Sequence, residues 1–184
     1  MKAQQFHDLS AQALQALDAL SQDDWTAQAL GLEWTCWQTV DHVIDGLFSY
    51  AFQMAARAPS GFLPFNELHA QSSATPDDLV MGLRGVLTML SDVLNAARED
   101  DTASDGVCAL TPSDWRARAA YELSLHTYDV ASALGADFRL PDALSQSVLD
   151  CHQLWMIDQD RARAASNPWS GLLAGSGRRQ FGDW

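Results

Sequence analysis

The sequence is poor in cysteine and in basic residues, and each scarcity excludes a class of protein. Its 3 cysteines, Cys36, Cys108 and Cys151, give an odd count without paired spacing or a C-x-x-C motif. A disulfide framework and a cysteine-based zinc or redox motif are therefore not expected. Lys and Arg number 11 against 24 Asp and Glu, for a formal net charge of -13. Such acidity disfavours binding to nucleic acid or to an anionic membrane surface.

Long apolar runs and targeting signals are missing as well. No run approaches the roughly 20 apolar residues that a membrane-spanning helix needs. The segment 1–20 lacks the apolar core and cleavage pattern of a secretory signal, so we expect a cytoplasmic protein. No repeat, linker or low-complexity tract divides the 184 residues. The sequence thus predicts a single domain over residues 1–184, with no second C-terminal domain.

Helical periodicity is what the sequence does contain. Apolar residues recur at steps of three and four, and turn signals separate the segments. Thr75 and Thr111 each precede a proline and an acidic residue, the typical start of a helix, and Gly135 suits a helix end. No stretch alternates with a period of two, so no sheet is expected. The predicted fold is an all-α, up-and-down four-helix bundle with extra short helical segments. The predicted helices span residues 4–20, 35–58, 75–98, 111–134 and 141–164, with one short turn in the tail.

A pair of potential metal ligands lies on the predicted fourth helix. Glu122 and His126 are four residues apart, which places them about 40° apart on one helix face and one turn apart. Carboxylate and imidazole both bind zinc, and His42 on the second helix is the natural third ligand. Spacing alone leaves a second interpretation open, because Arg118 and Glu122 also have the spacing of a surface ion pair on a solvent face.

The remaining chemistry-bearing side chains are less informative. His7, His69 and His152 have no neighbours in a catalytic pattern, so we expect structural roles for them. Arg84 lies in an apolar helical run. Its side chain either reaches the surface or points into an anion-binding pocket.

Three segments resemble the DinB-like metalloproteins. Residues 23–47, DDWTAQALGLEWTCWQTVDHVIDGL, resemble a tryptophan-containing loop that leads into a helix with a D-H pair. Residues 116–135, RARAAYELSLHTYDVASALG, and the ending 169–184, WSGLLAGSGRRQFGDW, resemble the other two signatures. The resemblance implies a four-helix bundle with a metal held between helices by His42, Glu122 and His126.

Many DinB-like proteins use three histidines, and here Glu122 stands in the position of the middle one. This His-Glu-His set resembles the mycothiol-dependent maleylpyruvate isomerase branch. That likeness implies a zinc-dependent thiol S-transferase or thiol-dependent isomerase. Its thiol co-substrate would be mycothiol, the thiol of actinobacteria, and its second substrate a small electrophile. It also implies that Arg84 is an active-site arginine and that Asp45 and Asp129 orient the ligands. The isomerase has a second domain that is not expected in this sequence, so maleylpyruvate itself is not the expected substrate.

Several alternatives remain open at the level of sequence. The protein could be a non-enzymatic metal-binding stress or binding protein, or a metal-dependent hydrolase, and nickel or iron could replace zinc. A fourth protein ligand, His152 or Cys151, would indicate a structural metal. Bundles of this kind often pair through a helix face, so a homodimer is a further expectation.

Overall fold

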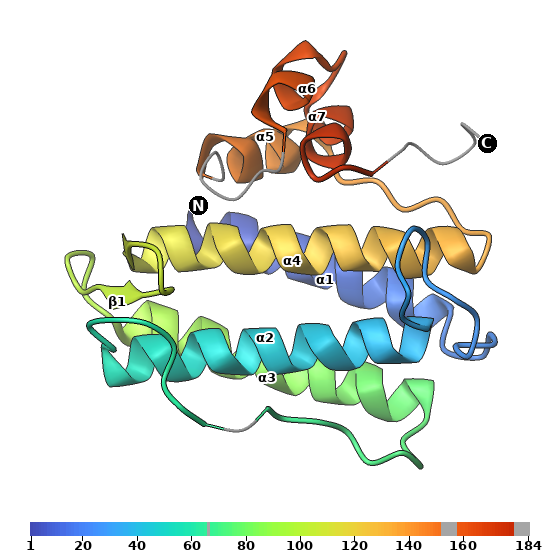
Figure 1. Ribbon diagram of the computed structural model, residues 1–184, viewed down its shortest axis with the longest axis horizontal. Helices are drawn as coiled ribbons and strands as arrows, with labels where there is room; N and C mark the ends of the chain where they lie inside the picture. The colour runs from blue at the N-terminus through green and yellow to red at the C-terminus, as the bar shows by residue number, and fades with distance from the viewer. Residues whose placement is uncertain (66, 152–157, 179–184) are drawn as a thin grey trace.

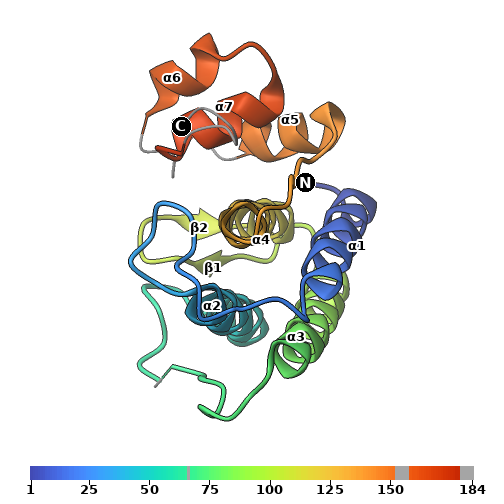
Figure 2. The ribbon, with the colours of Figure 1, turned by 90° about the vertical axis from the view of Figure 1, so that its right-hand side faces the viewer.

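Four long helices form the body of the protein (Figure 1). The computed structural model describes residues 1–65, 67–151 and 158–178. Seen from the end, the four helices surround a common core, with α4 beside α1 and α2, and α3 beside α1 and α2 (Figure 2). This arrangement confirms the predicted four-helix bundle. The helices are α1 (Ala3–Ala19), α2 (Cys36–Ala56), α3 (Pro76–Ala96) and α4 (Pro112–Ala133).

Threonine caps fix where three of these helices begin. Thr35, Thr75 and Thr111 each accept a hydrogen bond from the backbone N–H three residues later, at the start of α2, α3 and α4. In each case the side chain at that later position bonds back to the threonine N–H, which completes a capping box. A cap of this kind stabilises a helix by about 1 kcal/mol. The caps therefore hold the register of the two helices, α2 and α4, that carry the predicted ligands.

Helix α3 is apolar enough, by length and composition alone, to cross a membrane. In the structure it behaves as a bundle helix, because Leu79, Leu83 and Leu90 are buried in the core. Its outer face carries exposed charged side chains, among them Asp77 and Arg84. The apolar character of α3 is therefore explained by the side that faces α1 and α2.

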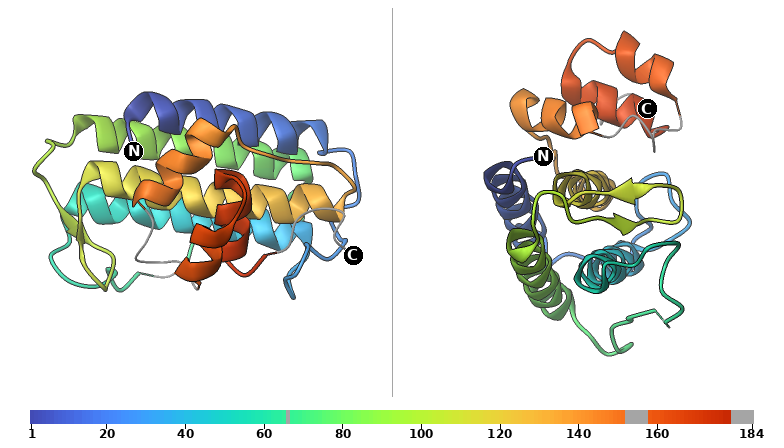
Figure 3. Two further views of the ribbon diagram at one scale, coloured as in Figure 1. Left: turned by 90° about the horizontal axis from the view of Figure 1, so that it is seen from above. Right: turned by 90° about the vertical axis from the view of Figure 1, so that its left-hand side faces the viewer.

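Three short helices cover one side of the bundle, as Figures 1 and 3 show. They are α5 (Asp142–Cys151), α6 (Gln159–Ala164) and α7 (Pro168–Gly175). Helix α5 packs on α4 and α1, and α7 joins α5 to α6. This layer buries the outer side of α4, which explains why α4 is buried on nearly all faces. The predicted extra helical segments are present.

Two local expectations are wrong. The predicted helix 141–164 is not continuous, because Asp158 has a non-helical backbone and caps α6 by accepting a bond from the Arg161 N–H. The chain also contains a small antiparallel hairpin, β1 (Ala103–Ser104) with β2 (Ala109–Leu110), where no sheet was expected. Its turn uses Gly106 at φ +90, and two-residue strands are too short to show a period of two in the sequence.

Candidate metal centre

Helices α2 and α4 bring three potential ligands together. One ligand atom from each of His42, Glu122 and His126 lies within 4.8 Å of the other two. The His126 Nε2 and the Glu122 Oε2 are 3.5 Å apart. Around a tetrahedral zinc ion, ligand atoms at the usual bond lengths lie about 3.4 Å from one another. The donor set and its spacing thus fit a divalent ion, with two ligands from one turn of α4 and the third from α2.

Trp34 forms a wall over the two histidines. Its ring centroid is 4.6 Å from that of His42 and 6.5 Å from that of His126. The loop before α2 is fastened to α4, because the Leu30 N–H donates to the Asp129 carbonyl at 3.0 Å. The tryptophan-containing segment of the sequence therefore serves to place an indole against both imidazoles.

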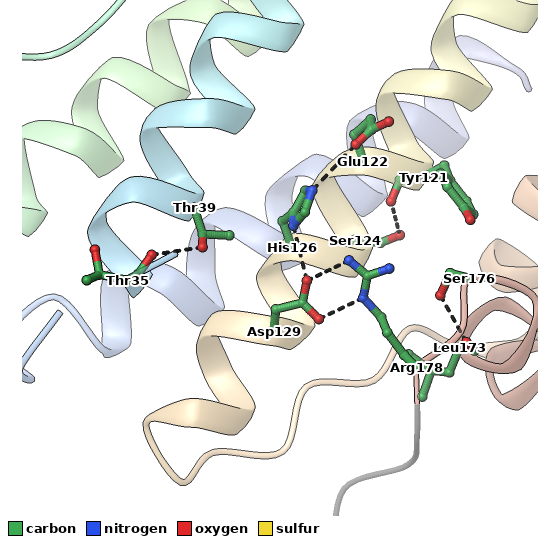
Figure 4. Close-up of polar contacts among 10 residues, drawn as sticks. All are labelled: Thr35, Thr39, Tyr121, Glu122, Ser124, His126, Asp129, Leu173, Ser176 and Arg178. Atoms are coloured by element: carbon green, nitrogen blue, oxygen red, sulfur yellow. Dashed lines mark hydrogen bonds and ion pairs between the residues drawn. The ribbon is translucent and has the colours of Figure 1, made fainter. Parts of the chain in front are cut away.

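A buried carboxylate orients His126 (Figure 4). The His126 Nδ1 lies 3.1 Å from the Asp129 Oδ2, and Asp129 is fully buried. Because a carboxylate only accepts hydrogen bonds, Asp129 favours a proton on Nδ1, so Nε2 is the nitrogen that would bind a metal after losing its own proton. The structure thus places Asp129 in contact with His126, as its predicted orienting role requires.

Arg178 completes this arrangement, and sequence reasoning gave it no role. Its Nε and Nη2 donate to the two oxygens of Asp129, each at 2.7 Å (Figure 4). The arginine follows α7, so the covering layer is bonded directly to the residue that orients His126. Arg178 lies in the G-R pair of the third resembling segment, which was the available signal.

Burial and neighbouring charges act in opposite directions on Glu122 and His126, whereas burial and the charge of His126 act together on His42. Burial disfavours the charged form of Glu122, yet the hydrogen bond and charge of His126 hold the pKa of that carboxyl below its usual value. Burial also opposes a charge on His126, but its bonds to Asp129 and Glu122 raise the pKa of the imidazole. Burial and the charge of His126 lower the pKa of His42. A proton on His126 would therefore compete with a metal ion for the same nitrogen.

Asp41 and Asp45 on α2 form hydrogen bonds to a loop and not to His42. The Asp45 Oδ1 accepts from the Leu68 N–H at 2.8 Å, so this carboxylate has a different hydrogen-bond partner from the one predicted. Asp41, which is buried, accepts from the Ala70 N–H and contacts the His69 Nδ1, each at 2.8 Å. Together they fix residues 67–70 beside the first half of α2.

The loop and α2 enclose a hollow of about 960 Å³ that has His42 in its wall. Its size lies within the usual range for ligand pockets, roughly 300–1,000 Å³. His69, which sequence reasoning set aside, lines the same hollow. The indoles of Trp25, Trp34 and Trp37 and several carboxylates make up much of the remaining wall.

Arginines occupy different positions from those expected. Arg84 is exposed on α3 and lines a separate hollow with His7 and other residues of α1, so the structure does not bring it to the cluster on α2 and α4. Arg118 is largely buried and pairs with Asp105 at 3.5 Å. The interpretation of Arg118 and Glu122 as an exposed surface pair is therefore wrong.

The side chain of Cys151 and the whole of His152, the predicted closing ligands, lie outside the described residues.

The fold and the cluster define a class of protein, a four-helix bundle with a candidate internal His-Glu-His metal centre. The profile of the DinB superfamily matches residues 5–130, and the chain belongs to that superfamily. No curated protein and no solved structure gives a significant match. The matched region carries all three ligands, whereas Arg178 and the covering helices lie beyond it.

Proposed function

We propose that the protein is a zinc-dependent thiol S-transferase or thiol-dependent isomerase of the cytoplasm. It would combine a low-molecular-weight thiol, with mycothiol as the first to test, and a small electrophile. The observation that carries the proposal is the cluster of His42, Glu122 and His126, whose three ligand atoms lie within 4.8 Å of one another. The resemblance to the mycothiol-dependent branch supports the choice of thiol, and the hollow at His42 supports an accessible site.

Each residue of the site has a physical task in this proposal. His42, Glu122 and His126 would hold the ion, and Asp129 would keep the Nε2 lone pair of His126 available. Zinc bound by three protein ligands would lower the pKa of a thiol that reaches its open position, and so supply a nucleophile at neutral pH. Trp34 shields both imidazoles on one side. The hollow beside His42 would receive the substrates.

Metal content tests the first half of the proposal. Elemental analysis would compare the untagged wild type with His126→Ala and with the control His7→Ala, whose histidine is exposed on α1. We expect about one zinc per chain in the wild type and in the control, and a loss of metal in His126→Ala. A wild type that binds no metal, even when zinc is offered, would refute the proposal.

Thiol consumption tests the second half. Loss of free mycothiol would be followed in the presence of a general electrophile such as chlorodinitrobenzene, with the zinc-loaded protein and with His126→Ala. We expect consumption above the uncatalysed rate only with the loaded wild type. Bound zinc without thiol consumption would instead support a non-enzymatic binding protein, and hydrolysis of an activated ester under the same conditions would support a hydrolase.

A further inference from the structure

The hollow beside His42 is strongly acidic. Five carboxylates line it, from Asp23, Asp24, Asp41, Asp45 and Glu67. Among the described residues in its wall there is no Lys or Arg. Low-dielectric walls that carry charge of one sign concentrate ions of the opposite sign and repel ions of the same sign. The hollow is therefore poorly suited to a carboxylate substrate and well suited to a cation.

Three tryptophans line the hollow, and the N–H groups of two of them, Trp25 and Trp37, are bonded to backbone carbonyls. The Trp25 Nε1 donates to the Leu20 carbonyl at 2.9 Å, and the Trp37 Nε1 donates to the Ala74 carbonyl at 2.8 Å. Trp34 is 41% exposed and packs against His42. Indole rings attract cations through their electron-rich faces, and tryptophan does so most strongly of the aromatic residues.

The carboxylates also belong to a built wall. Asp45 accepts a bond from the N–H of residue 68 and Asp41 one from the N–H of residue 70, and Asp24 accepts from the N–H and the hydroxyl of Thr26. The two bonds from Thr26 lower the pKa of Asp24. Backbone N–H groups thus hold three of the five carboxylates in place, and the imidazole of His69 contacts Asp41 and Glu67.

We propose that this hollow binds the positively charged group of a substrate, an amine or quaternary ammonium, next to the ligand cluster. The inference rests on the proposed function for the identity of the reacting site, and it adds the substrate class. A cationic group would lie among the indoles and carboxylates, and the reacting end of the same molecule would reach the cluster at His42. Dicarboxylate electrophiles would be excluded by charge.

Binding of three matched probes tests the inference. Choline, its uncharged carbon isostere dimethylbutanol and the carboxylate dimethylbutyrate share one shape and differ in charge. Affinities would be measured by tryptophan fluorescence and calorimetry on the metal-free protein, so that the result does not depend on metal or on turnover. We expect choline to bind about tenfold more tightly than the isostere, and no detectable binding of the carboxylate. Equal affinity for choline and the isostere, or preference for the carboxylate, would overturn the inference.

A charge-matched pair of variants locates the effect. Asp23→Asn with Glu67→Gln removes two charges from the hollow, whereas Glu99→Gln with Asp137→Asn removes two exposed charges that do not line it. We expect choline affinity to fall several-fold in the first double variant only. An equal loss in both would mean that net charge alone attracts the probe, which would refute a specific site.

These outcomes are distinguishable from those of the proposed function. Choline binding by a protein that holds no zinc would leave the inference about the hollow standing and refute the metal-dependent function. Zinc binding and thiol consumption without preference for the cation would do the reverse.

Discussion

At the scale of single residues, the centre depends on how His126 is held. Its imidazole lies between two carboxylates, Glu122 at 3.5 Å and Asp129 at 3.1 Å. Only the first is a proposed ligand, and the second determines which nitrogen carries the proton. Asp129 in turn is held by Arg178 through two bonds. The orientation of one ligand is therefore set by the hydrogen bonds of two further side chains, Asp129 and Arg178.

The substitution Asp129→Asn tests this hydrogen-bond network. An amide of the same size keeps the volume but presents a donor as well as an acceptor, so it no longer enforces the same tautomer. We expect zinc affinity, measured by competition with a chromophoric chelator, to fall about 10–100-fold. Asp142→Asn, on the exposed start of α5, is the control and should leave the affinity unchanged. Unaltered affinity in Asp129→Asn would show that packing alone orients His126.

His69 provides a prediction about pH. Its hydrogen bonds to Glu67 and Asp41 raise the pKa of the imidazole. A group with a raised pKa stabilises the folded state below its unfolded pKa, and this contribution disappears as pH rises through the folded pKa. Titration by NMR should therefore place the pKa of His69 above the ordinary value, about 6.5, in the wild type and lower in Glu67→Gln. The control Glu99→Gln should give the wild-type curve, and a Glu67→Gln curve equal to it would contradict the prediction.

At the scale of elements, sequence patterns predicted the four long helices well because each carries its own signals. Apolar periodicity and the capped starts at Thr35, Thr75 and Thr111 are local properties of the chain. The same patterns cannot show which helix faces meet. For that reason Glu122 and His126, on one helix, could be paired from spacing, whereas Arg84 was expected at the site but lines a separate hollow.

Features that depend on contacts between residues far apart in the sequence could not be predicted from local sequence patterns. Arg178 reaches Asp129 across 49 positions, and no local signal specifies that return. His69 lies in a loop without periodicity, and its place in the hollow depends on backbone bonds from residues 68 and 70 to α2. The non-helical backbone at Asp158 was also not predicted, because the apolar pattern of the sequence continues up to this residue.

Glycines inside α2 and α3 give a prediction about element stability. A Cβ added to Gly46, one turn after His42, or to Gly85 would meet no atom within 4 Å. Glycine inside a helix costs about 0.5–1 kcal/mol relative to alanine. We therefore expect Gly46→Ala and Gly85→Ala each to raise the free energy of unfolding by about that amount, measured by urea denaturation.

Comparing the two glycine variants also tests whether the space beside Gly46 is open in solution. Gly46 lies on the helix that carries His42, whereas Gly85 is exposed on α3. Zinc content should be unchanged in both variants. A loss of stability in Gly46→Ala alone would indicate that the open space beside α2 is closed in solution.

At the scale of the whole molecule, the proposed ion would join α2 to α4. A ligand that binds only the folded state stabilises it by about 2.7 kcal/mol when present at 100 times its Kd. For a chain of this size that corresponds to a rise in Tm of about 5–10 °C. We expect such a rise when zinc is added to the metal-free wild type, and none in His42→Ala. An equal rise in both would mean that zinc binds elsewhere.

The bond between Arg178 and Asp129 makes the covering helices a reporter of the centre. Coupling between two sites is reciprocal. If release of Arg178 weakens the hold on the ion, then occupancy of the centre must oppose detachment of α7. Amide hydrogens of α7 (Pro168–Gly175) should accordingly exchange more slowly in the zinc-loaded protein, and this protection should be absent in Arg178→Ala. The rate of hydrogen exchange in α7 would then report how tightly the cluster on the other side of α4 binds its ion.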